Sequence, residues 1–188
     1  MLSFQYGHDH LTPGIALELV SGKRKGILSN DIREKVRQNR KVIESIVQDH
    51  KTVYGINTGF GPLCTTVISE ADTKKLQYNL LLSHSVGVGD PIQAEISRLM
   101  LILKVHSLAF GFSGIAESTL DRILWHIENN VIPVVPSQGS VGASGDLAPL
   151  AHLFLPLIGM GKVYHEDDIR PAGEVLQQGA EQFPVAIA

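Results

Sequence analysis

Apolar residues recur at helical spacing along much of the chain. In residues 30–48 the aliphatic side chains fall largely on one face of a helix, and polar residues precede them. The aliphatic positions are Ile32, Val36, Val42, Ile43, Ile46 and Val47. This pattern predicts an amphipathic helix.

A second helical pattern covers residues 69–87. It opens with Ser69 and Asp72 in the Ser-x-x-Asp spacing typical of a helix N-terminus, and one face then carries residues at four-residue steps. Those residues are Leu76, Leu80 and His84. We expect this helix to end near Gly87.

The pair Asp90-Pro91 predicts the start of a third helix. An aspartate can cap free N–H groups, and a proline at the first helical position loses no donor that the helix needs. We expect this helix to run to about Phe110. Its long apolar run favours burial on most sides.

Further elements follow along the chain. Aliphatic residues at 120–127 predict a helix that ends at Asn129-Asn130. Residues 131–146 hold two prolines and three glycines and suit a long irregular crossing, before a helix from about Leu147 that Pro156 is expected to bend. Residues 161–171 suit a short hairpin or strand. The expected fold is therefore mainly α with a few short strands, in a single domain over residues 1–188.

Composition and charge narrow the class of protein. The chain has 188 residues, 44% hydrophobic and 19% charged, as in soluble globular proteins. Its formal net charge is −3, and its one basic run is short, so we expect no nucleic acid partner. The longest apolar runs are too short or too interrupted to span a bilayer, so we expect no membrane partner.

The cysteine and histidine content bears on compartment and metals. Cys64 is the single cysteine, which excludes an intramolecular disulfide and favours a reducing compartment. The first ten residues lack a signal-peptide pattern, so a cytoplasmic location is expected. His8 and His10 have no further ligand set nearby, so we expect no metal site.

The glycine-bearing loops at 54–63 and 137–145 are the candidate functional segments, because function tends to lie on loops that a rigid scaffold holds. Residues 138–146 read QGSVGASGD. A phosphate-binding P-loop requires Lys followed by Ser or Thr after its last glycine, whereas Asp146 follows Gly145 and would repel phosphate. A nucleophile elbow requires glycine two residues after Ser144, where Asp146 stands. Asp146 can also simply cap the helix that follows.

A fourth possibility makes the backbone itself the reagent. The Gly145 nitrogen can attack the Ala143 carbonyl carbon, and loss of that oxygen and of the Ser144 hydroxyl as two waters leaves a five-membered ring with an exocyclic methylidene. The product is the electrophile 4-methylideneimidazol-5-one (MIO). Glycine leaves the attacking nitrogen uncrowded, serine carries the leaving hydroxyl, and alanine keeps the attacked carbonyl accessible.

Long motifs in this chain resemble those of the aromatic amino acid ammonia-lyases, in the order and spacing of that family. They are YGINTGFGPL at 54–63, NLLLSHSVGVG at 79–89 and GSVGASGDLAPLAHL at 139–153. The resemblance extends from about Phe4 to about Gln178. It implies the aspartase/ammonia-lyase-like helical fold, with this chain as the N-terminal MIO-bearing domain, and a homotetramer.

The resemblance also implies an incomplete chain. Family members are well over twice this length, so the central helical bundle and the C-terminal part would be absent. We therefore expect little turnover by the 188-residue chain on its own.

The same resemblance implies roles for particular residues. Ala143, Ser144 and Gly145 would form MIO, Asp146 would assist the cyclisation, and no external cofactor would be required. Tyr54, on a loop that moves over the bound substrate, would be the base that removes the β-proton of the substrate.

The pair Ser83-His84 occupies a position that helps to choose the substrate ring in this family. A histidine offers a donor or acceptor to an imidazole nitrogen. The resemblance therefore implies L-histidine as the substrate, with trans-urocanate and ammonia as products. A tyrosine or phenylalanine ammonia-lyase or aminomutase of the same family is an alternative. A non-catalytic helical module that binds a partner or oligomerises is another.

Overall fold

A computed structural model of the chain describes residues 2–49, 53, 58, 70–143 and 145–179. Tyr54, Ser144, and the loop 54–63 apart from Thr58 lie outside the described residues, as does Ser69.

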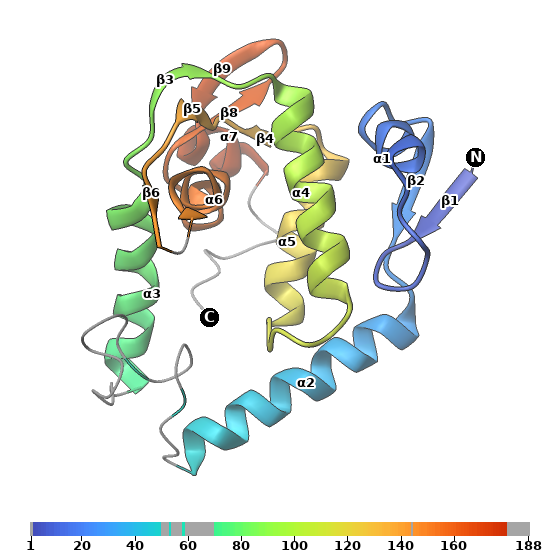
Figure 1. The fold of residues 1–188 in the computed structure, drawn as a ribbon, viewed down its shortest axis with the longest axis vertical. Coiled ribbons are helices and arrows are strands. Elements are labelled where there is room, and N and C mark those ends of the chain that lie inside the picture. The colour runs from blue at the N-terminus through green and yellow to red at the C-terminus, as the bar shows by residue number, and fades with distance from the viewer. Residues whose placement is uncertain (1, 50–52, 54–57, 59–69, 144, 180–188) are drawn as a thin grey trace.

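The described chain consists of helices, with short strands between several of them (Figure 1). The helices are α1 Pro13–Val20, α2 Asn30–Gln48, α3 Glu70–His84, α4 Ala94–Ala109, α5 Glu117–Glu128, α6 Ala148–Phe154, a 3-10 helix Leu155–Ile158 and α7 Ala172–Gly179. The strands are β1 Leu2–Gln5, β2 Arg24–Ile27, β3 Val88–Pro91, β4 Ile132–Pro133, β5 Pro136–Gln138, β6 Val141–Gly142, β7 Gly145–Asp146, β8 Lys162–His165 and β9 Asp168–Pro171. The predicted mainly α fold with a few short strands is confirmed.

Helices α4 and α5 pack against each other at the centre of the molecule (Figure 1). Their buried aliphatic side chains form the main core together with aromatic residues of the N-terminal segment and Leu153 of α6. The most buried of these residues include Phe4, Tyr6, Leu101, Ile102, Val105, Leu120 and Ile123. Full burial of one such side chain stabilises the fold by about 1.5–3 kcal/mol. Because many of these side chains lie on α4 and α5, this helix pair is the scaffold for the loops around it.

The helix predicted at residues 30–48 is confirmed as α2. Ser29 caps it, because its side chain accepts the N–H of Ile32. Of its apolar face, Ile32 and Val36 are buried, whereas Val42 is exposed. Arg33 ties α2 to α5 through ion pairs with two acidic side chains, Glu117 at 2.9 Å and Asp121 at 2.6 Å.

The expected helix start at Asp90-Pro91 is wrong. Residues 88–91 form β3, which pairs antiparallel with β5 so that Pro91 lies opposite Pro136. In this two-stranded sheet the missing proline N–H groups cost no interior ladder bond. Helix α4 begins at Ala94 without a side-chain cap and ends where expected, at Ala109. Its predicted burial on most sides is confirmed, because 12 of its 16 residues are buried or half-buried and the exposed Ile96 and Leu103, seven positions apart, lie on one face.

The later elements follow the sequence more closely. Helix α5 covers the predicted positions and ends at Glu128, and residues 162–171 form the β8–β9 hairpin. Helix α6 ends at Phe154 and the chain continues as a 3-10 helix that contains Pro156. A proline lacks the N–H that would continue the α-helical ladder, which explains this change.

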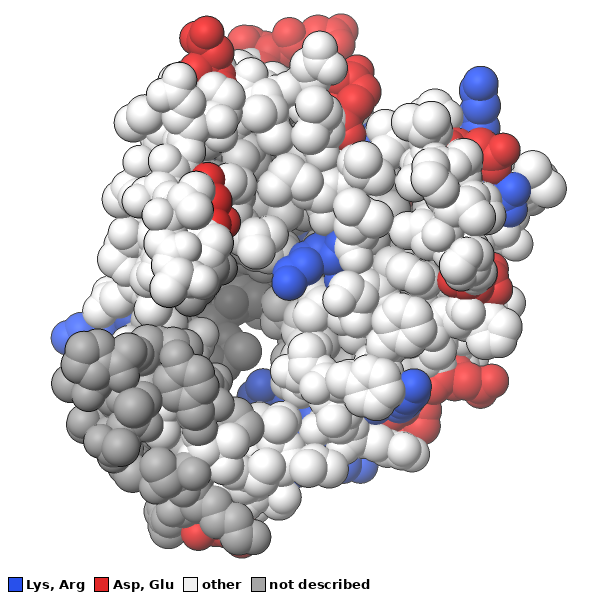
Figure 2. Space-filling view, in the orientation of Figure 1, with Lys and Arg blue, Asp and Glu red and all other residues white. Residues whose placement is uncertain are grey.

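The surface and the helices give two further observations. Figure 2 shows acidic side chains along the upper rim, near β9 in Figure 1, and no basic patch on the face in view. Among the described residues, none of the helices has the length and apolarity needed to cross a bilayer.

His126 is a buried histidine inside the core. Its Nδ1–H donates to the Val131 carbonyl at 2.8 Å, while its Nε2 has no partner among the described residues. Burial lowers the pKa of His126 to about 4, because a protonated ring would carry an unpaired charge in the core.

We predict that acid destabilises this fold through His126. Its pKa in the folded chain lies below its ordinary value of 6.5. The unfolded chain therefore binds the proton first, and stability present above pH 6.5 is lost as the pH falls toward 4. A pKa difference of this size corresponds to roughly 3 kcal/mol in the free energy of unfolding. Urea unfolding at a series of pH values measures the loss.

The variant His126→Asn keeps a donor for Val131 and does not titrate. We expect it to be less stable at pH 7 but to lose less stability between pH 7 and pH 5. His10→Asn, at an exposed histidine, should keep the original pH dependence. An unchanged pH dependence in His126→Asn contradicts the prediction.

Candidate active site

The predicted irregular loop contains a tight hairpin. Strands β6 and β7 pair antiparallel, with Val141 opposite Asp146 and Gly142 opposite Gly145. The chain therefore reverses direction between the two glycines, and Ala143 follows directly on β6. Gly145 has a φ of +86°, a left-handed conformation that favours glycine.

Asp146 holds the base of this hairpin. Its Oδ1 accepts the N–H of Ala148, the first residue of α6, at 3.1 Å, and the N–H of Ser140 at 3.0 Å. The predicted capping role is thus confirmed by the bond to Ala148, although Leu147 is the residue at the N-cap position. The bond to Ser140 was not predicted, and it joins the chain before the hairpin to the helix after it.

Gly139 makes room for this carboxylate. A Cβ on Gly139 would overlap both carboxylate oxygens of Asp146. By contrast, a Cβ on Gly142 would meet no atom within 4 Å, and Gly142 does not have a positive φ. The glycine at position 139 is therefore required by the Asp146 contact, whereas the glycine at 142 is not.

The C-terminal turn of α3 carries Ser83 and His84. The His84 Nδ1 lies 2.9 Å from the Leu80 carbonyl oxygen and 3.1 Å from the Ser83 Oγ. A carbonyl only accepts hydrogen bonds, so Nδ1 carries the proton in the neutral ring and Nε2 keeps a lone pair. The Ser83 hydroxyl donates to the same Leu80 carbonyl.

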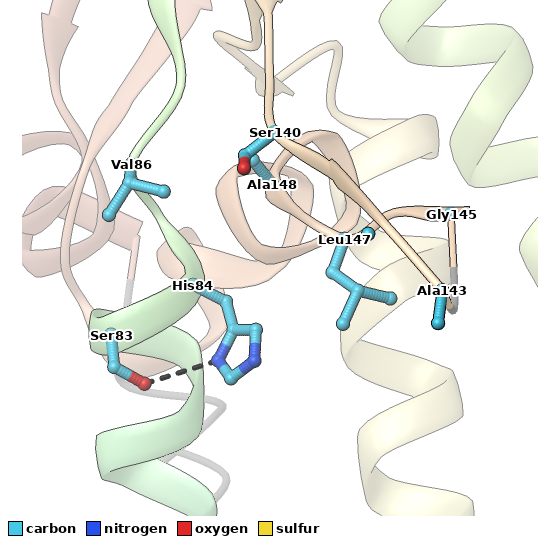
Figure 3. Close-up of a pocket in the computed structure, with 9 residues that line it drawn as sticks. Ser83, His84, Val86, Ser140, Ala143, Gly145, Leu147 and Ala148 are labelled. Carbon is cyan, nitrogen blue, oxygen red and sulfur yellow. Dashed lines mark hydrogen bonds between the residues drawn. The ribbon is translucent and has the colours of Figure 1, made fainter.

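These two segments face each other across a pocket of about 280 Å³ (Figure 3). Its lining residues are Ser83, His84, Val86, Ser140, Gly142, Ala143, Gly145, Leu147 and Ala148. In Figure 3 the edge of the His84 ring that bears Nε2 points toward Leu147. The volume is near the lower end of the range for small-molecule sites, about 300–1,000 Å³.

The structure thus brings together several residues that the sequence singled out. Ser83 and His84 lie opposite Ala143 and Gly145, although some 60 residues separate them along the chain. Asp146 lies directly behind the hairpin. The positions of Tyr54 and Ser144 lie outside the described residues.

Some contributors to the site were missed. Val86 and Leu147 line the pocket with apolar side chains that carry no chemical signal in the sequence. His152 was not singled out in the sequence, but its Nε2 accepts the N–H of Gly87 at 3.0 Å. No spacing rule could have found this contact, because it joins residues 65 apart in the chain.

A helical domain with a glycine-bearing hairpin opposite a histidine has the arrangement expected of a small-molecule site on loops. The sequence profile described as "Aromatic amino acid lyase" matches residues 11–186. The match covers most of the chain, which belongs to this family.

Curated relatives and solved structures agree with this assignment. The chain is 46% identical over 159 residues to the histidine ammonia-lyase of Bacillus subtilis, an alignment that covers 85% of this chain and 31% of the relative. With the histidine ammonia-lyase of Bacillus velezensis it shares 47% identity over 150 residues, covering 80% and 29%. The crystal structure of histidine ammonia-lyase from Trypanosoma cruzi superimposes with a TM-score of 0.83 at 38% identity, covering 95% of this chain and 34% of that one. The chain therefore spans about a third of the length of these relatives.

We predict that Gly139→Ala detaches Asp146 from its two partners. The added methyl group would displace the carboxylate, and each lost bond to a charged acceptor costs about 1.5–3 kcal/mol. Amide hydrogen exchange at Ser140 and Ala148 should then accelerate by about tenfold or more. Gly142→Ala is the matched control and should leave both amides unchanged. Equal exchange in the two variants would show that Gly139 does not hold this contact.

Proposed function

We propose that the protein carrying this chain deaminates L-histidine to trans-urocanate and ammonia. The observation that carries the proposal is the pocket in which Ser83 and His84 face the hairpin residues Ala143 and Gly145. Relatives named histidine ammonia-lyase, at 46–47% identity over most of this chain, support the same substrate.

The hairpin suits the formation of MIO from residues 143–145. Gly145 has a left-handed backbone, and apart from its chain neighbours no atom lies within 4 Å of the point where a Cβ would stand. The missing side chain leaves room for its nitrogen to attack. Ala143 is exposed and follows directly on β6. Once formed, the group would supply an electrophile that makes the substrate amine a better leaving group. Asp146 would hold the flanking backbone while residues 143–145 react.

His84 would select the substrate ring. Its Nδ1–H is committed to Leu80, so its Nε2 can accept an N–H from an imidazole. An acceptor left unpaired in a closed site costs binding energy, which disfavours a substrate whose ring offers no donor. Removal of the substrate β-proton by Tyr54 stays a prediction from the sequence.

A second candidate is a tyrosine-directed enzyme of the same family. The same Nε2 acceptor could receive a phenol O–H, and a tyrosine aminomutase structure from Streptomyces globisporus superimposes with a TM-score of 0.85 at 26% identity. A homotetrameric assembly and a cytoplasmic location also stay proposals.

MIO formation predicts a loss of mass. The protein containing residues 143–145 should be lighter than its sequence by two waters in intact mass spectrometry. Ser144→Ala removes the leaving hydroxyl and should restore the full sequence mass, or the full mass less one water if only the ring closes. Ser140→Ala, at the base of the hairpin, should still lose both waters. An unmodified mass in the parent protein contradicts the prediction.

His84→Leu should lower kcat/KM for L-histidine by about tenfold to a hundredfold, because the imidazole N–H of the substrate then lacks its acceptor. Activity on L-phenylalanine, which has no such donor, should not fall. Ser83→Ala is the matched control: Leu80 still fixes the His84 tautomer, so the loss for histidine should stay below about fivefold. These rates are measured on the full-length protein by release of the unsaturated product. A parent that prefers L-tyrosine would favour the second candidate.

A further inference from the structure

Helix α6 contacts both walls of the pocket within about one turn. At its start, Ala148 lines the pocket and donates its N–H to Asp146. Four residues later, the His152 Nε2 accepts the N–H of Gly87 at 3.0 Å, directly after Val86 of the opposite wall. Gly87 lies in the short connection between α3 and β3.

Gly87 has little room to move toward either neighbour. A Cβ at this position would lie 3.1 Å from the His152 ring and 3.2 Å from the Gln138 carbonyl oxygen, closer than most side-chain contacts. The next residue, Val88, pairs with Gln138 on β5. The connection is therefore held between α6 on one side and β5 on the other.

This contact lies close to the substrate-selecting residue. Gly87 follows His84 by three residues, and Val86 between them lines the pocket. Burial lowers the pKa of His152, so its ring is neutral near pH 7 and its Nε2 keeps the lone pair that the Gly87 N–H needs. The exit of α3 is thus fixed by a side chain of the helix that also anchors the hairpin.

We propose that His152 is a positioning residue for substrate recognition, which acts through Gly87 to fix the distance between His84 and the β6–β7 hairpin. His152 does not line the pocket, so it affects how well the substrate ring fits rather than the steps that break bonds. The inference rests on the proposed function, because it assumes that His84 recognises the substrate.

Binding of L-histidine tests the proposal without turnover. The measurement is calorimetry on the full-length protein in the Ser144→Ala background, so that neither MIO nor catalysis is needed. His152→Leu leaves the Gly87 N–H unpaired and should weaken binding about tenfold. His152→Gln can place a carbonyl oxygen near the former Nε2 position, and its affinity should stay within about threefold of the parent. Gly87→Ala crowds the same contact from the other side and should weaken binding as His152→Leu does.

Kinetics in the Ser144-containing protein provide a second measurement. His152→Leu should raise KM for L-histidine about tenfold while kcat changes less than threefold, and His152→Gln should restore KM. His10→Leu is the matched control at an exposed histidine and should change neither parameter. A purely structural role would instead lower the amount of folded protein with KM unchanged.

The outcomes separate this inference from the proposed function. If the parent binds histidine but His152→Leu binds it equally well, or if His152→Gln is as weak as His152→Leu, the inference is overturned alone. If the parent neither binds nor deaminates histidine, the proposed function and the inference are overturned together. Should His152→Leu fail to fold, the other two variants test the proposal. Weak binding by Gly87→Ala together with normal binding by His152→Gln supports it, and any other combination of results overturns it.

Discussion

The Asp146 carboxylate makes the contact on which the geometry of the site depends. It accepts N–H groups from Ser140, before the hairpin, and from Ala148, at the start of α6. Hydrogen bonds to an ionised acceptor are roughly twice as strong as neutral ones. One side chain therefore sets the position of β6, the position of β7 and the direction in which α6 leaves the loop. Gly139 permits this arrangement because it has no Cβ to occupy the space of the carboxylate.

The hairpin is held at its base and open at its tip. Asp146 at the base is partly buried, whereas Gly142, Ala143 and Gly145 are exposed. A backbone that is to close on itself must bring a nitrogen to a carbonyl two residues away, which a fully hydrogen-bonded helix or inner strand would prevent. Under the proposed function, the fixed base keeps the reacting residues opposite His84 while the open tip leaves them free to react.

The sequence predicted well what local interactions determine. Amphipathic spacing located α2 and α5, Pro156 marked the end of α6, and the motifs at 79–89 and 139–153 located the residues that meet in the pocket. It failed at residues 88–91, where Asp90-Pro91 satisfies a local helix rule but pairing with β5 prevails. The bonds of Asp146 to Ser140 and of His152 to Gly87 were not predictable, because chain geometry in three dimensions, rather than spacing, brings those groups together.

The shape of the pocket is determined by the core more than by the residues that line it. Most lining side chains are small, so they fix little of the geometry themselves. Both walls are instead tied to α6, a helix of 7 residues that would not be stable in isolation. Its helical form depends on Asp146 at one end and on Leu153, which is buried in the core with α4 and α5. Packing at Leu153 therefore stabilises the fold and, through the same short helix, keeps His84 and the hairpin in register across the pocket.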